Sequence, residues 1–398
     1  ELVERVEDHG AGMRFAEEAL TLAQQTGDRR RQMEAWTALA WARVGVHDPT
    51  ARQAAEHALD LSRELGDLRA EVSMLLAIAN VYGLDDLERH EAFLHEALAK
   101  SESLDDKAME IALLGAIGQQ FERRGDYYRQ LVEFERPRAV LARKIGHRLE
   151  EGKALMMCGQ IQGLYLGDIQ AGLILEREAA DIWGELNTRL FPLLRIAQMQ
   201  TAIGKYDAAA EALEQARPLS ERGARDFGRA GYHLVSAILD NARGGIERLK
   251  LVLMHCDEVL RLVADNLVSR QYHMAASCQA ARAHLALWRQ LSDPERRRHH
   301  AEAALTASGA ALSFYRQFGF TQVIECQAQE ILFRHSLALA ANEHFDEAAR
   351  FLRDAYTEMM RKHDLIPADT PHRKHFLENL GVHREIRAAV EVHTEGLP

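Results

Sequence analysis

Apolar residues recur at spacings of three and four along most of the chain, in runs separated by short polar breaks. This spacing gathers apolar side chains on one face of an α-helix. Several breaks pair Gly with Asp, as at Gly27-Asp28 and Gly66-Asp67. Gly ends a helix in the left-handed conformation and Asp caps the next helix. Alternating strand patterns bounded by hairpin turns are absent from the sequence, so we predict an all-α fold of about eighteen helices with short loops.

A repeat of about 40 residues underlies this pattern. The segment "LAQQTGDRR" (22–30) returns 39 residues later as "LSRELGDLR" (61–69). Further breaks continue the period at Gly27, Gly66, Asp105, Gly146, Leu186 and Gly223. One amphipathic hairpin cannot bury its own apolar face, whereas stacked hairpins can. The sequence therefore predicts roughly nine antiparallel helical hairpins stacked as an α-solenoid.

The regularity of the repeat changes along the chain and predicts three parts. Residues 1–243 follow the period closely, and residues 244–365 follow it loosely. Two prolines in "IPADTP" (366–371) then break the array. We expect residues 366–398 to form a C-terminal capping helix and tail, since a solenoid needs its last apolar face covered.

Three segments carry a family resemblance: "LLGAIGQQFERRGDY" (113–127), "LLRIAQMQTAIGKYDAAAEALEQA" (193–216) and "FRHSLALAANEHFDEAARFLRDA" (333–355). Their order of large apolar, small and aromatic or Leu positions resembles the tetratricopeptide repeat. The resemblance implies a right-handed superhelix with a concave groove lined by the first helix of each hairpin. It also implies a scaffold that binds a protein or peptide in this groove.

The period near 40 is longer than the usual 34 of that family. It is similar to the arrays at the C-terminal side of large signalling ATPases, including bacterial transcriptional activators and nucleotide-cyclase-linked regulators. The end "HRKHFLENLGVHREIRAA" (372–389) resembles the helix that closes such arrays. This likeness implies a sensor or partner-recruiting arm with an ATP-binding module upstream. A stand-alone scaffold is the alternative.

Composition narrows the class of partner. Hydrophobic residues make up 47% and charged residues 27%, which is typical of a soluble, folded chain. The net charge of −11 argues against direct nucleic-acid binding. The sequence has neither an uncharged apolar run of membrane-spanning length nor a signal peptide, so we expect no membrane partner. Four scattered cysteines suggest buried thiols in a cytoplasmic protein: Cys158, Cys256, Cys278 and Cys326.

Catalytic and metal signatures do not stand out. The motifs GxxxxGK[ST], GxSxG and HExxH are missing from the sequence, so an enzyme is disfavoured and no cofactor is expected. His90 and His95 are five residues apart and do not share a helix face, while His299 and His300 are adjacent and diverge. We therefore expect no metal site.

Four amide side chains are the candidate partner-binding residues. Asn80, Gln119, Gln160 and Gln198 each follow the small residue of a first helix, at separations of 39, 41 and 38. They predict a ladder along the concave groove, where amides can grip the backbone of an extended peptide. Two other readings stay open, a solvated row of amides or hydrogen bonds between repeats.

Pro137 is the candidate hinge. It stands where the repeat favours Ala, in the middle of a predicted helix, and a proline there removes one backbone hydrogen bond. The expected result is either a bend tolerated in the stack or a hinge that changes curvature on binding.

The leading function is protein–protein interaction in the concave groove. The alternative is a small-molecule effector sensor in a regulatory ATPase, for which a compact, enclosed pocket is expected.

Overall fold

The structure is a computed structural model of the chain. It describes residues 9–45, 48–83, 86–184, 186–222, 226–264, 270–319 and 325–395. These residues form helices and short connections, with no strand among them. The contacts divide the chain into two compact units, 1–120 and 121–398, each of which is considered by itself. The predicted change of regularity near residue 243 remains a prediction. Gly223, one of the predicted breaks, lies outside the described residues.

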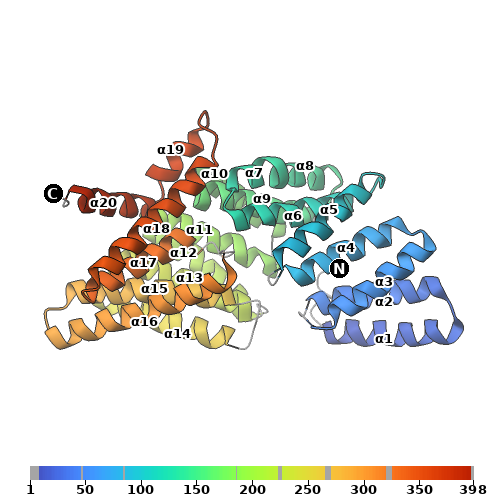
Figure 1. Cartoon of the computed structure of the whole chain (residues 1–398), viewed down its shortest axis with the longest axis horizontal. Helices are drawn as coiled ribbons and strands as arrows, with labels where there is room; N and C mark the ends of the chain where they lie inside the picture. The colour runs from blue at the N-terminus through green and yellow to red at the C-terminus, as the bar shows by residue number, and fades with distance from the viewer. Residues whose placement is uncertain are drawn as a thin grey trace. The chain divides into compact units, whose positions relative to one another are not determined.

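The first unit is built from α1 to α6, whose last turn runs across the division (Figure 1). Their bounds are α1 His9–Thr26, α2 Arg29–Gly45, α3 Ala51–Leu65, α4 Leu68–Tyr82, α5 Leu87–Ser101 and α6 Lys107–Arg124. From α1 to α5, helices consecutive in the chain pack on one another, and α2 also packs on α4.

The second unit continues the same arrangement to the C-terminus. Its first helices are α7 Tyr127–Arg129, the π-helix η2 Gln130–Glu135, α8 Arg136–Lys144, α9 Arg148–Gln160, the π-helix η3 Ile161–Tyr165 and α10 Ile169–Trp183. The others are the 3-10 helix η4 Asn187–Arg189, α11 Leu190–Ala202, α12 Tyr206–Arg222, α13 Asp226–Arg243, α14 Ile246–Val263, α15 Arg270–Gln290, α16 Pro294–Phe318, α17 Ala328–Ala341, α18 Phe345–Asp364, α19 Pro371–Glu378 and α20 Gly381–Glu395. Consecutive helices pair, and α11, α13, α15 and α17 also pack each on the next.

Caps confirm several of the predicted helix boundaries. Gly66 ends α3 in the left-handed conformation, with φ of 67°. The Asp67 side chain then accepts a hydrogen bond from the Ala70 N–H and starts α4. Asp126 and Asp168 cap α7 and α10 in the same way. Such caps satisfy N–H groups that the first helical turn leaves unpaired. The all-α solenoid of antiparallel hairpins is therefore confirmed.

Small residues let the helices approach closely, as the repeat pattern predicts. At the crossing of α9 and α10, a Cβ on Gly172 would lie 2.8 Å from the Gly159 carbonyl oxygen and from the Gly163 Cα. Ala230, Ala275 and many other alanines are fully buried, while Tyr272 fills space in the same core. The four cysteines are free and buried, as expected. No helix in the described part of the chain is long and apolar enough to cross a membrane.

Pro137 lies in the first turn of α8, directly after a widened π-helical turn. There the Arg136 N–H bonds to the Leu131 carbonyl, five residues back. A proline cannot donate the usual backbone hydrogen bond, and a π-turn is one way for a helix to absorb this defect. The chain thus continues as helix through Pro137. Whether this turn acts as a hinge remains a prediction.

The C-terminal segment covers the last hairpin with two helices, where the sequence predicted one. Phe376 of α19 and Ile386 of α20 are fully buried, and both helices pack on α18. Arg334 of α17 donates to both carboxylate oxygens of Glu385 on α20, at 2.6 and 3.3 Å. This paired contact fixes the closing helix to the stack.

Helices from both ends of the second unit also touch. Lys362 of α18 bonds to Tyr127 of α7, and Arg361 donates to the backbone carbonyl of Arg124. Asn379, just after α19, donates to the backbone carbonyl of Gly167. In a simple array each repeat contacts only its neighbours. The second unit differs because its last helices close onto its first.

Candidate functional site

The four predicted amides fall into two pairs. Asn80 and Gln119 are exposed on the first unit, whereas Gln160 and Gln198 are buried in the second. The two pairs belong to different units. Their role in binding a partner remains a prediction.

Gln160 and Gln198 both accept hydrogen bonds from Arg195, one between helices and one within α11. Arg195 of α11 donates to the Gln160 Oε1 at 3.2 Å and to the Gln198 Oε1 at 3.0 Å. The Gln160 Nε2 donates to the Tyr165 hydroxyl at 3.3 Å. Arg195 also forms an ion pair with Glu325. The contact between Gln160 and Arg195 corresponds to the reading in which the amides join neighbouring repeats, whereas Gln198 is bonded within its own helix.

This polar chain extends to the end of α6. The Tyr165 hydroxyl donates to the Glu122 Oε1 at 2.8 Å, and its ring stacks on Tyr127 with 4.1 Å between centroids. Burial raises the pKa of the Glu122 carboxyl, against the hydrogen bond from Tyr165 that lowers it. The stacked tyrosines therefore connect Glu122 to the second polar centre, which is built on Lys362.

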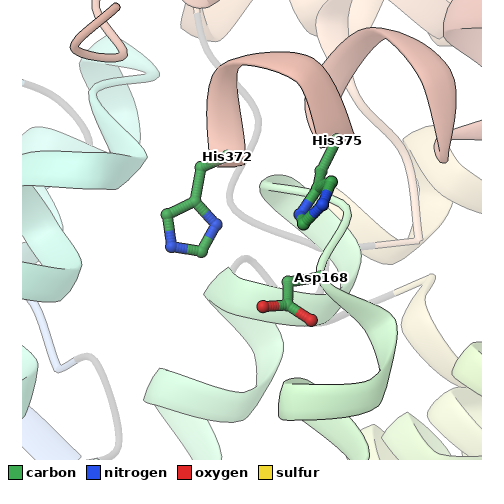
Figure 2. A group of neighbouring side chains, drawn as sticks. All are labelled: Asp168, His372 and His375. Carbon is green, nitrogen blue, oxygen red and sulfur yellow. The ribbon is translucent and has the colours of Figure 1, made fainter. Parts of the chain in front are cut away.

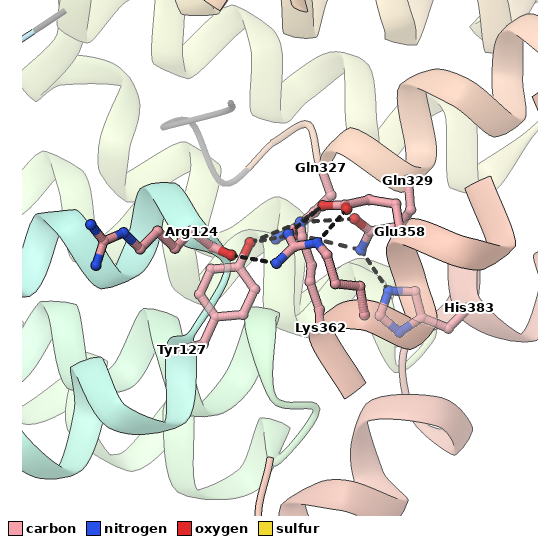
Figure 3. A network of polar contacts seen from close by, with 8 residues as sticks. Arg124, Tyr127, Gln327, Gln329, Glu358, Lys362 and His383 are labelled. Carbon is pink, nitrogen blue, oxygen red and sulfur yellow. Dashed lines mark hydrogen bonds and ion pairs between the residues drawn. The ribbon is translucent and has the colours of Figure 1, made fainter. Parts of the chain in front are cut away.

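Lys362 lies on the apolar face of α18 and is only 3% exposed. Its Nζ donates to the Tyr127 hydroxyl at 3.1 Å, the Gln327 Oε1 at 3.3 Å and the Gln329 Oε1 at 2.9 Å (Figure 3). Glu358, one turn earlier on α18, places a carboxylate oxygen 3.6 Å from the same nitrogen. An ammonium group has three protons, so this cage supplies an acceptor for each one.

The orientation of Gln329 follows from His383. The His383 Nδ1 lies 2.6 Å from the Phe376 carbonyl, which can only accept, so Nδ1 carries a proton. Burial lowers the pKa of His383 to about 3, so the ring is neutral and Nε2 accepts from the Gln329 Nε2 at 2.8 Å. The Gln329 oxygen is thereby left facing Lys362. Helix α20 thus helps to orient the cage.

The lysine keeps its charge near neutral pH. Burial lowers the pKa of Lys362 to about 8, while the Glu358 carboxylate opposes this shift. Burial would raise the pKa of Glu358, but hydrogen bonds from Arg361 and the charges of Lys362 and Arg361 outweigh it and hold the pKa below its ordinary value. The pair is therefore ionised in the folded protein.

A cavity of about 330 Å³ opens beside this cage. Arg123, Arg124, Arg361 and Lys362 line it, together with the carboxyls of Glu122 and Glu358. Arg361 donates to both oxygens of Glu358, at 2.7 and 2.8 Å, and to the Arg124 carbonyl at 2.8 Å. Four basic groups against two carboxyls make the lining positive, and arginines in such positions favour carboxylate or phosphate ligands.

Sequence reasoning missed this site, although one signal was present. Ala348, Leu352, Ala355 and Met359 form the buried stripe of α18, and Lys362 continues it at the same spacing. A lysine on an apolar stripe is rarely buried without partners. Its partners come from segments far away in the sequence, so local periodicity could not name them.

The fold and these interhelical networks define a helical-hairpin solenoid. The sequence matches no protein-family model. No curated protein matches it by sequence either. Among solved structures, the chain is similar to the crystal structure of the P58(IPK) TPR domain, with 11% sequence identity over 96% of this chain and 99% of that chain. The TM-score is 0.25, so the solenoid fold rests on the helices and contacts described above rather than on this likeness.

Proposed function

We propose that this chain is a protein-interaction module that acts by binding rather than by catalysis. Its second unit receives an acidic group of a partner polypeptide, a side chain or a C-terminal carboxylate, in the cavity lined by Arg123, Arg124, Arg361 and Lys362. The carrying observation is the positive lining of a cavity that the Lys362 cage holds in place. Pre-organisation of this kind lowers the entropic cost of binding.

A small anionic effector is the second candidate. The volume of about 330 Å³ is at the lower end of the range for ligand pockets and suits a single small anion as well as a side chain. The resemblance to signalling ATPases supports the wider proposal of a cytoplasmic sensor or partner-recruiting arm with an upstream ATP-binding module.

Peptide binding tests the proposal directly. Fluorescein-labelled ten-residue peptides with Asp or Glu residues are compared with matched Asn or Gln peptides, and free C-termini with amidated ones, by fluorescence polarisation. We expect the acidic peptides with a free C-terminal carboxylate to bind more tightly than the matched peptides. Added salt should weaken this binding, because the contact is largely electrostatic.

A matched pair of variants locates the binding. Arg124→Glu reverses a charge in the cavity lining, and Arg298→Glu makes the same change on an exposed turn of α16. The first variant should weaken the binding of acidic peptides at least about tenfold, which is about 1.4 kcal/mol, and the second should leave their affinity nearly unchanged. Equal effects of both variants, or no preference for acidic peptides, would overturn the proposal. Binding of phosphate or citrate without peptide binding would favour the effector candidate.

A further inference from the structure

Two histidines and an aspartate from distant segments meet in the second unit. His372 and His375 extend from α19, and Asp168 caps α10 (Figure 2). One ligand atom from each residue lies within 4.8 Å of the others. Residues three apart share a helix face, and the same spacing places metal ligands in di-iron helical bundles.

The histidine nitrogens supply an independent observation. The Nδ1 atoms of both His372 and His375 are buried and have no hydrogen-bond partner among the described residues. His372 is only 8% exposed. Since a buried polar atom without a partner costs free energy, this pair calls for a ligand that the side chains alone do not provide.

The Asp168 carboxylate is held in position by a hydrogen bond that leaves it able to bind a metal ion. The Asp168 Oδ1 accepts from the Ala171 N–H at 3.3 Å, as the N-cap of α10. A carboxylate has two oxygens with several lone pairs, so capping leaves capacity for a metal ion. The cap also fixes the direction in which the carboxylate points.

The backbone around the cluster is pinned on both sides. Gly167 has φ of 80°, and a Cβ there would lie 2.5 Å from the carbonyl oxygen of His375. The Asn379 Nδ2 donates to the Gly167 carbonyl at 2.9 Å. The loop before α10 and helix α19 therefore meet at backbone contact, which brings their ligand atoms together.

We propose that His372, His375 and Asp168 bind one divalent transition-metal ion of the zinc class, with water as a fourth ligand. Two imidazole nitrogens and one carboxylate oxygen suit Zn²⁺, and three protein ligands leave a fourth tetrahedral position. Ligands about 2.1 Å from the ion are about 3.4 Å apart, so binding shortens the present separations, which are at most 4.8 Å, by up to about 1.4 Å. The ion clips α19 onto α10.

Titration of the metal-stripped full chain with Zn²⁺, against a chromophoric chelator, tests the site. We expect one ion per chain with a micromolar or lower Kd, and a thermal shift that grows with zinc concentration. The double variant His372→Gln/His375→Gln should lose this ion. Asp168→Asn should weaken it at least about tenfold while retaining the helix cap, since Asn caps as well as Asp does.

The control removes two histidines elsewhere. His95 and His299 are exposed and outside the cluster, so His95→Gln/His299→Gln should bind zinc like the parent chain. Circular dichroism without metal checks that each variant folds. If the double variant misfolds, His375→Gln and Asp168→Asn decide the question. Unchanged stoichiometry and affinity in the cluster variants, or equal loss in the control, overturns the proposal.

Discussion

The Nζ of Lys362 lies 3.1 Å from the hydroxyl of Tyr127, a residue 235 positions earlier in the chain. This contact joins α18 to α7 and places a buried charge where the two ends of the second unit meet.

Removal of the lysine charge should destabilise the second unit. Lys362→Met removes the donor to the Tyr127 and Gln329 oxygens and leaves the Glu358 carboxylate without this partner, so we expect the free energy of unfolding to fall by about 3 kcal/mol. Urea denaturation measures the change. Lys374→Met, on an exposed position of α19, is the control and should change the value by less than about 0.5 kcal/mol. Similar values for both variants would contradict the role of the cage.

The same lysine predicts a pH dependence. Its pKa in the folded state is about 8, below the unfolded value of about 10.4, so between these values the unfolded chain binds more protons. Stability from this group therefore rises with pH from about 8 to 10, by up to about 1.4 kcal/mol per pH unit. The slope should be present in the parent chain and missing from Lys362→Met. Parallel stability curves for the two proteins would refute this assignment.

Glu176 predicts the opposite dependence. Its two carboxyl oxygens are buried without a hydrogen-bond partner among the described residues, and burial raises its pKa well above the ordinary value. The folded chain then holds a proton that the unfolded chain releases, so stability falls as pH rises above about 4.5. Glu176→Gln should gain stability over the parent between pH 5 and 7, by up to about 1.4 kcal/mol per pH unit. Exposed Glu211→Gln should show no such trend.

Gly167 tests the close approach of α19. Ala at this position would have to adopt a left-handed backbone conformation, and its Cβ would lie 2.5 Å from the His375 carbonyl oxygen. Gly204 has a similar φ of 74° but nothing within 4 Å of an added Cβ. Gly204→Ala should cost about 1 kcal/mol of backbone strain, and Gly167→Ala about 1–3 kcal/mol more. Thermal unfolding and protease cleavage near α19 measure the difference, and equal costs would argue against tight docking.

Much of the fold could be predicted because its determinants are local. Gly66 and Asp67 mark a helix end and start by their own conformational preferences, and the apolar spacing indicates which face is buried. Pro137 marked an unusual helix, although the π-turn before it was not predicted. Local patterns of this kind act over a few residues and are visible in one sequence.

The candidate sites could be predicted only in fragments. The spacing of His372 and His375 can be recognised in the sequence, but no local pattern connects them to Asp168. The position of Lys362 on an apolar stripe likewise does not indicate that Tyr127 is its partner. Which repeats meet across the unit depends on small rotations added from one hairpin to the next. Those rotations are set by side-chain packing. The spacing of the amides therefore singled out Gln160, but it could not predict the hydrogen bond that Gln160 accepts from Arg195.

Closure of the second unit has a consequence for how it folds. An open repeat array can nucleate anywhere and lose its terminal repeats one at a time. Contacts such as Tyr127 with Lys362 and Gly167 with Asn379 span more than 200 residues, and they form only after the intervening helices are in place. Long-range contacts of this kind slow folding because chain entropy is lost before they are gained. We therefore expect the second unit to unfold as a single cooperative block. Deletion of α18 to α20 should then destabilise the first helices of the unit as well as those next to the deletion.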